Sequence, residues 1–316
     1  MPVSLVRLTV PGNILLLGEY AVLEEGGLGL AMAIDIRVRV EASPAESLLI
    51  EAVWSGSTLS WTPGRPGESL LIDAVVDAVT WWLRRECGAR IRVDSTDFFS
   101  TDGRKSGLGS SAAVSVALVC GLLHAAGALS AARGLEARML AMRAHRRAQG
   151  GRGSGYDIVT SFHGGTGLFR GGADPGWDPC ALSGDPRVLI FAGPAPVSTA
   201  DAVSCYGRWK ERNPGAARDY LQESNNAILS FVRAGSAAQA LPWLGTCRKL
   251  GIELGRSIGV PADLPVPPGL DPHWCKALGA GNELGLCLLP PGAQMPPDHG
   301  GLRVVPRADT GVTWEE

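Results

Sequence analysis

A glycine-rich segment in the first half of the chain has the residue types of a phosphate-binding loop. It runs from Lys105 to Ala113 and reads Lys-Ser-Gly-Leu-Gly-Ser-Ser-Ala-Ala. Glycine lets the backbone approach an anion and turn its N–H groups inward, and a helix expected to start near Ser110 adds the positive end of its dipole. The serine hydroxyls can donate to phosphate oxygens or bind Mg²⁺, and Lys105 adds a positive charge. The alternative is that Ser110 only caps the helix. The segment also differs from the GxxxxGK[ST] phosphate-binding loop.

An aspartate in a second glycine-rich stretch is the candidate for chemistry at the acceptor. Asp157 follows Gly153 and Gly155 and precedes an apolar run that begins at Ile158. A carboxylate at this point can orient an acceptor group and take up its proton as a phosphoryl group is transferred. The alternative is a cap at the start of the next helix, which the flanking glycines also permit.

Hydrophobic periodicity predicts the elements that position these residues. Alternation and short apolar runs predict strands over residues 3–10, 14–17, 33–42, 48–54, 91–99, 188–191, 286–289 and 302–305, with a break at Pro11-Gly12. Helical spacing predicts helices over 68–87, from 110 onward, over 135–149, and over 200–212, 216–234 and 241–258. Residues 171–185 lack periodicity and are expected to link two domains.

Composition limits the class of protein and of ligand. Hydrophobic residues make up 45% of the 316 residues and charged residues 19%, which is typical of a globular protein. With 29 basic and 31 acidic residues, the chain is not expected to bind nucleic acid or an anionic membrane. The seven cysteines are widely spaced and form no CxxC pair, so we expect reduced thiols in the cytoplasm rather than disulfides or a zinc site. The apolar stretch 112–129 is expected to be a buried helix, not a membrane span.

Three segments together resemble the signature motifs of the GHMP kinases and occur in that family's order. The first covers residues 10–23 and reads Val-Pro-Gly-Asn-Ile-Leu-Leu-Leu-Gly-Glu-Tyr-Ala-Val-Leu. The second is the loop at 105–113, and the third, at 276–281, reads Lys-Ala-Leu-Gly-Ala-Gly. Within the family, Lys105-Ser106 before the loop, the segment 144–157 and the segment 196–201 resemble the phosphomevalonate kinases.

The resemblance implies a fold and an activity. The fold would be α+β with two domains: residues 1–178, like domain 2 of ribosomal protein S5, and residues 179–316, ferredoxin-like, with the active site in the cleft between them. The activity would be ATP- and Mg²⁺-dependent phosphorylation of 5-phosphomevalonate to 5-diphosphomevalonate, by a monomer or homodimer. The alternatives are another acceptor, such as mevalonate or a sugar, or a non-catalytic sensor that binds ligand on the same fold.

The resemblance also assigns roles to individual residues. Asp157 and Lys105 would be catalytic, and Ser111 would bind Mg²⁺. The nucleotide would contact Gly107, Leu108, Gly109, Ser110, Ser111, Ala112, Gly279, Ala280 and Gly281. The phosphorylated acceptor would contact Asn13, Glu19, Tyr20, His145, Arg146, Ser154, Gly155, Ser198 and Thr199, with Arg147 and Arg152 as further candidate cations.

Two positions depart from the family pattern. Asn13 stands where related kinases usually have lysine, which removes a cation that would neutralise developing charge. Glu283 stands in a run where the family usually continues with glycines, and its charge would repel a triphosphate unless it points away.

Overall fold

The structure, a computed structural model, describes residues 4–64, 68–100, 103–151, 153–182, 184–195, 197–295 and 301–315. The chain packs into two compact units. One comprises residues 1–13, 33–165 and 308–316, and the other comprises residues 14–32 and 166–307. Strands β1 (Val6–Leu17) and β2 (Leu28–Pro44) each contribute residues to both units. The two family domains predicted from the sequence, with a boundary between residues 178 and 179, divide the chain differently from these units and stay a prediction.

The first unit is built on a mixed sheet. Its strands lie in the order β12-β1-β2-β5-β3-β4. The strands other than β1 and β2 are β3 (Leu49–Trp54), β4 (Ser57–Trp61), β5 (Ala89–Asp94) and β12 (Thr313–Glu315). Strands β3 and β5 are parallel, which requires a crossover, and helix α1 lies in that connection.

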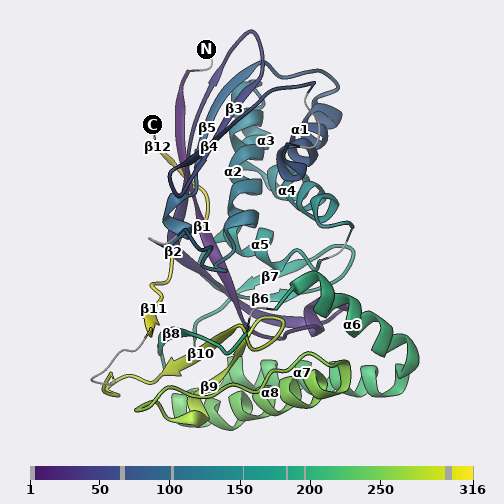
Figure 1. The fold of residues 1–316 in the computed structure, drawn as a ribbon, viewed down its shortest axis with the longest axis vertical. Coiled ribbons are helices and arrows are strands. Elements are labelled where there is room, and N and C mark those ends of the chain that lie inside the picture. Colours follow the sequence, from purple (N-terminus) through teal and green to yellow (C-terminus); the bar gives the residue numbers. More distant parts are fainter. Residues whose placement is uncertain are drawn as a thin grey trace. The chain divides into compact units, whose positions relative to one another are not determined.

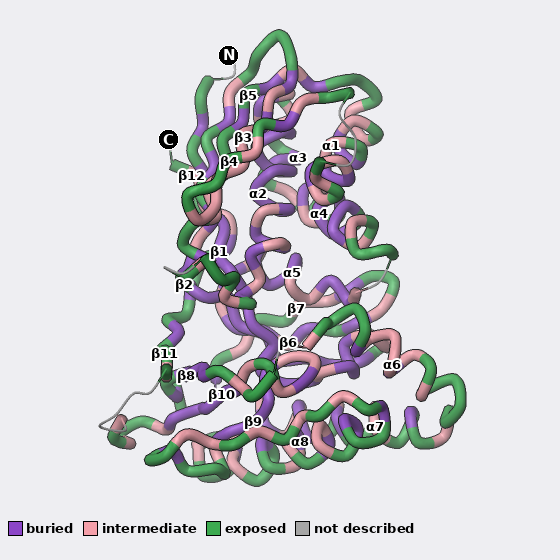
Figure 2. Tube along the Cα trace, in the orientation of Figure 1, coloured by how far each residue is buried: buried purple, intermediate pink, exposed green. Residues whose placement is uncertain are grey.

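Helices cover one face of this sheet (Figure 1). They are α1 (Leu70–Leu83), α2 (Ser110–Ala125), α3 (Leu129–Arg133), α4 (Leu135–Ala148) and α5 (Tyr156–His163), and a 3₁₀ turn, η2 (Thr96–Phe98), follows β5. Helix α2 is buried on nearly all sides, as its all-round apolar composition predicts (Figure 2). Within the described part of the chain, every helix is too short or too polar to span a membrane.

The second unit contains a small antiparallel sheet and three long helices. The sheet has the order β11-β8-β10-β9, and its strands are β8 (Arg187–Ala192), β9 (Cys275–Leu278), β10 (Leu284–Leu289) and β11 (Arg303–Val304). The helices are α6 (Thr199–Arg212), α7 (Pro214–Arg233) and α8 (Ala237–Ile258), with 3₁₀ turns η1 (Ala21–Leu23) and η3 (Pro272–Trp274). Strand β6 (Thr166–Arg170) pairs antiparallel with the first residues of β2, and β7 (Gly176–Pro179) pairs antiparallel with β6.

Several predicted boundaries are wrong for physical reasons. The predicted break at Pro11-Gly12 is absent, because β1 is continuous. Its register with β12 ends at Thr9, so Pro11 need not donate to that neighbour. Helix α1 ends at Leu83, since Arg84 itself takes the left-handed conformation expected of Gly88. The predicted linker at 171–185 contains a strand, β7.

Candidate active site

The loop before α2 has the backbone geometry of an anion site. Gly107 and Gly109 both have positive φ, +71° and +77°, in the left-handed region where glycine carries no steric cost. Gly109 is the N-cap residue of α2 and has no side chain with which to accept from the helix's first N–H groups. Among the described residues no other side chain caps this end. The first turn of a 16-residue buried helix is therefore left available for a ligand's oxygens.

Asn13 packs against this loop from β1. Its backbone N–H donates to the carbonyl of Leu108 at 3.1 Å, and its side-chain Nδ2 donates to Oγ of Ser161 at 3.0 Å. A Cβ added to Gly109 would lie 2.3 Å from the same Nδ2, so only glycine fits there. Asn13 is 2% exposed, and its Oδ1 has no hydrogen-bond partner among the residues described. A buried acceptor without a donor costs free energy, so packing alone does not explain Asn13 at this position.

Three predicted site residues from three helices meet beside the loop. Nε2 of His145 on α4 lies 3.1 Å from Oγ of Ser111 on α2. Nδ1 of the same ring lies 3.5 Å from Oδ2 of Asp157 on α5. The imidazole is 3% exposed and the Asp157 side chain 22% exposed. His145 thus stands between the hydroxyl proposed for Mg²⁺ and the carboxylate proposed for the acceptor.

The glycine turn before α5 is held in place by Arg146. Its Nε donates to the carbonyl of Gly153 at 3.1 Å, and its Nη2 donates to that of Ser154 at 2.6 Å. Gly155 has φ +85°, and a Cβ there would come within 3.1 Å of Met142. Arg146 therefore supports the segment that presents Asp157, and its contact with an acceptor stays a prediction.

Lys105 lies at the start of the loop, where it forms an isolated antiparallel bridge with Phe99. Its ammonium has no ion-pair or hydrogen-bond partner in the described part of the chain. Although much of the residue is exposed, burial around the ammonium lowers the pKa of Lys105. The neighbouring Ser106 has a buried Oγ that is also without a partner among the described residues. Within the described ranges, this end of the loop therefore holds an ammonium and a hydroxyl without partners.

The remaining predicted residues lie in the second unit, where two of them are linked. The hydroxyl of Tyr20 donates to the carbonyl of Ala280, within the predicted nucleotide segment Gly279 to Gly281. Burial, and next to it the charge of Glu19, raises the pKa of Tyr20 well above its usual value, so the hydroxyl stays a donor. The Glu19 carboxylate accepts from Nζ of Lys276.

Other predicted residues of this unit serve local structure. Ser198 caps α6, since its Oγ accepts from the N–H of Asp201 at 3.3 Å, and Thr199 is the first residue of that helix. The Glu283 carboxylate accepts from the N–H of Val197 at 3.5 Å. The Glu283 side chain is thus turned toward the backbone that precedes α6. Arg152 lies outside the described residues.

Sequence reasoning missed four residues that support the site residues. Ser161 binds Asn13, Gln149 lies 3.2 Å from Nε2 of His145, and both Lys276 and Tyr220 bind Glu19. Lys276 is 4% exposed although it is a lysine. Lys276 lies inside the third motif and Gln149 inside the segment 144–157, which were the available signals. The contacts of Ser161 and Tyr220 join residues distant in sequence.

The donor set suits a magnesium ion that is held largely by substrate phosphates. No group of three or more His, Cys, Asp or Glu side chains in the described ranges forms a metal site. Mg²⁺ commonly keeps several waters and takes one or two protein oxygens together with phosphates. The hydroxyl of Ser111, next to the uncapped start of α2, fits that requirement.

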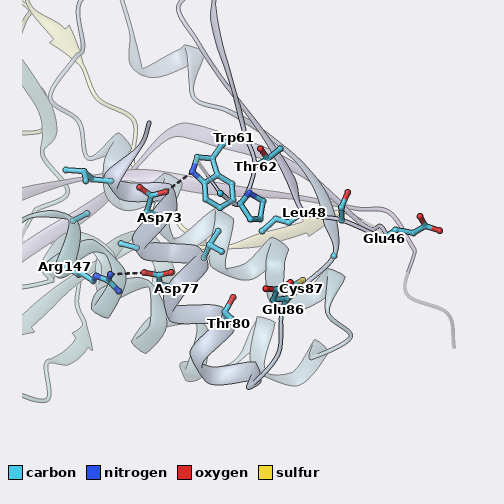
Figure 3. A pocket seen from close by; sticks show the side chains of 18 residues that line it. Glu46, Leu48, Trp61, Thr62, Asp73, Asp77, Thr80, Glu86, Cys87 and Arg147 are labelled. Carbon is cyan, nitrogen blue, oxygen red and sulfur yellow. Dashed lines mark hydrogen bonds and ion pairs between the residues drawn. The ribbon is translucent and has the colours of Figure 1, made fainter. Parts of the chain in front are cut away.

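A separate groove lies in the first unit, along α1 (Figure 3). It has a volume of about 1110 Å³, and Nε1 of Trp61 donates to Oδ1 of Asp73 at 2.8 Å in its wall. Arg147 pairs with Asp77 at 2.8 Å in the same groove. Among the described lining residues, Arg147 alone was given a site role from the sequence. Arg147, a further candidate cation, is thereby occupied by a neighbouring carboxylate.

Comparison with known proteins finds a family model and a relative that match part of the chain. Residues 72–165 match the GHMP kinases N terminal domain. A phosphomevalonate kinase from Saccharolobus solfataricus is 31% identical over 165 residues, which cover 51% of this chain and 48% of that protein. The match thus spans about half the length of this curated relative.

Two solved structures share the fold. A Lin0012 protein from Listeria innocua superposes with a TM-score of 0.82 at 19% identity, covering 99% of this chain and 100% of its own. The phosphomevalonate kinase of Streptococcus pneumoniae, in complex with phosphomevalonate and AMPPNP, superposes with a TM-score of 0.70 at 19% identity, covering 89% and 92%. At this identity the likeness concerns the fold, and it confirms the predicted α+β GHMP kinase fold.

Proposed function

We propose that this chain, a member of the GHMP kinase superfamily, transfers the γ-phosphoryl group of ATP to the phosphate of 5-phosphomevalonate. The bond between the γ-phosphorus and the bridging oxygen of ADP breaks, and a bond to an oxygen of the acceptor phosphate forms. ADP and 5-diphosphomevalonate leave. Any proton on the attacking phosphate oxygen passes to Asp157.

The observation that carries the proposal is the uncapped start of α2. Gly107 and Gly109 open the backbone there, and the helix N–H groups and dipole favour the charge that gathers on transferring phosphate oxygens. Ser111, Ser110 and the free ammonium of Lys105 supply further donors beside it. Such phosphoryl transfer needs positioning and charge stabilisation rather than a covalent intermediate on the protein.

Mg²⁺, when bound, would neutralise charge on the nucleotide's phosphates. Ser111 would hold it on the protein side, because its hydroxyl already contacts His145 and keeps lone pairs for a ligand. Asp157, 22% exposed at the end of the same chain of contacts, would orient the acceptor.

The choice of a phosphorylated acceptor is supported by the chemistry near Lys105. An acceptor that already carries a phosphate needs cations, and Lys105 offers one without a partner in the described part of the chain. Support also comes from the phosphomevalonate kinases among the similar proteins. Asn13, uncharged and bonded to Ser161, would then shape the loop rather than bind the acceptor phosphate as a cation.

The proposal is tested by measuring ADP release with ATP, Mg²⁺ and, separately, phosphomevalonate, mevalonate, galactose and homoserine. We expect turnover with phosphomevalonate, and a loss of at least about 100-fold in Asp157→Asn. Turnover with another acceptor would replace the proposed substrate. ATP binding without turnover on any acceptor would instead favour a ligand sensor.

A further inference from the structure

His145 occupies a position that neither a substrate contact nor simple packing explains. The side chain is 3% exposed, so an acceptor cannot reach it without displacing its neighbours. Both ring nitrogens nonetheless face polar groups: Nε2 faces Ser111 and Gln149, and Nδ1 faces Asp157. The position of the hydrogen on the ring therefore decides which of these neighbours donates to it and which accepts from it.

The contacts select one tautomer. A carboxylate oxygen accepts, so the Nδ1 that faces Oδ2 of Asp157 is the donor. The amide nitrogen of Gln149, 3.2 Å from Nε2, can only donate, so Nε2 must be bare. The Ser111 hydroxyl, 3.1 Å from the bare Nε2, then turns its own hydrogen toward the ring.

We infer that His145 is a positioning residue: its Nε2 holds the Ser111 hydroxyl so that the lone pairs of Ser111 face bound phosphate or Mg²⁺, and its Nδ1–H orients the Asp157 carboxylate. The inference rests on the proposed function, because it deepens the assignment of that site. Ser111 becomes an oxygen ligand with its hydrogen out of the way, which a hard cation prefers. The 3.5 Å separation of Nδ1 and Oδ2 is long for a hydrogen bond, and such contacts tighten when substrate binds.

The tautomer can be measured without any catalysis. The chain has five histidines, so ¹⁵N-histidine labelling gives few signals, and His145→Asn identifies the pair that belongs to residue 145. Long-range ¹H–¹⁵N correlation at neutral pH should show Nδ1 protonated and Nε2 bare. An Nε2–H tautomer would overturn the inference, whether or not the protein proves to be a kinase.

Two variants separate the two halves of the proposed action. His145→Asn places an amide N–H near the position of Nδ1 and keeps the donor to Asp157, but it loses the acceptor for Ser111. His145→Gln reaches the position of Nε2 and keeps that acceptor, but it loses the donor. We expect His145→Gln to lower kcat about tenfold with KM for ATP nearly unchanged. We expect His145→Asn to raise the Mg²⁺ and ATP concentrations needed for half-maximal activity by a similar factor.

His124→Gln serves as the control, because His124 lies near the other end of α2 and contacts only the carbonyl of Ser4 by hydrogen bond among the described residues. It should keep wild-type constants, and all three variants are first compared by thermal unfolding. Wild-type kcat and KM in both His145 variants would overturn the positioning assignment. If no acceptor turns over, ATP and Mg²⁺ affinities replace the kinetic constants, and unchanged affinities in His145→Asn would overturn it.

Discussion

Gly109→Ala tests how the phosphate loop is held, because this glycine combines two constraints. Its φ of +77° is left-handed, and an added Cβ would lie 2.3 Å from Nδ2 and 2.6 Å from Cγ of Asn13. Asn13 is buried and cannot simply swing away without leaving Ser161, to which it donates at 3.0 Å. The substitution should therefore cost backbone strain and also break a buried contact.

The two costs have separable magnitudes. Left-handed backbone at a residue with a Cβ costs about 1–2 kcal/mol. Loss of the bond between Asn13 and Ser161 leaves buried polar groups without partners, at about 1–3 kcal/mol. Gly56→Ala isolates the first cost, since Gly56 has φ +75° and no atom within 4 Å of an added Cβ.

Urea unfolding followed by circular dichroism measures both variants. We expect Gly109→Ala to lower the free energy of unfolding by about 2–5 kcal/mol and Gly56→Ala by about 1–2 kcal/mol. In an Asn13→Ala background the cost of Gly109→Ala should drop toward that of Gly56→Ala. Equal losses for the two glycines in the wild-type background would refute the close fit between Asn13 and the loop.

Three further outcomes follow from charges and burial. Burial lowers the pKa of Lys105, so kcat/KM should fall with rising pH at a lower pH than it would for an ordinary lysine. Lys105→Arg should move this alkaline decrease in kcat/KM to higher pH. An unmoved decrease would count against a charged Lys105 in the reaction. Burial, and next to it a neighbouring arginine, lowers the pKa of His163, so the unfolded state binds more protons below about pH 6.5 and the free energy of unfolding should fall as pH drops through that range. His163→Gln should remove part of that fall in urea titrations, and an unchanged dependence would contradict it. Lys276→Met leaves the Glu19 carboxylate without its counter-charge and should lower the free energy of unfolding in urea by about 3–5 kcal/mol. Lys249→Met, at an exposed ion pair, should lower it by less than about 1 kcal/mol. Similar losses in the two variants would contradict the buried pair.

The sequence predicts those elements whose signal is local. Helix α2 follows from an apolar composition on all sides, and β2 and β5 follow from alternation. Helices α6, α7 and α8 also lie close to their predicted bounds. The site residues of the loop could be chosen because glycines, serines and a lysine stand together in the chain.

The sequence does not predict features that depend on distant contacts. Strand β1 runs through Pro11-Gly12, where a Cβ on Gly12 would meet the carbonyl of Leu108 at 2.5 Å, a contact across almost one hundred residues. Ser161 lies outside the quoted motifs and matters only through Asn13, and Gln149, although it lies in the segment 144–157, was given no role there. Strand β7 lies in a stretch of Gly, Pro and Asp whose composition does not favour a strand. Its pairing with β6 makes it one.

The identity of the bond formed is the most direct test of the proposed reaction. ³¹P nuclear magnetic resonance of purified protein with ATP, Mg²⁺ and 5-phosphomevalonate follows that bond without assuming it. The account predicts that ATP signals give way to those of ADP and to a new coupled pair from a second diphosphate, and that Asp157→Asn abolishes the change. Persistence of the phosphomonoester signal while ATP binds, or a new monoester formed only from an unphosphorylated acceptor, would contradict it.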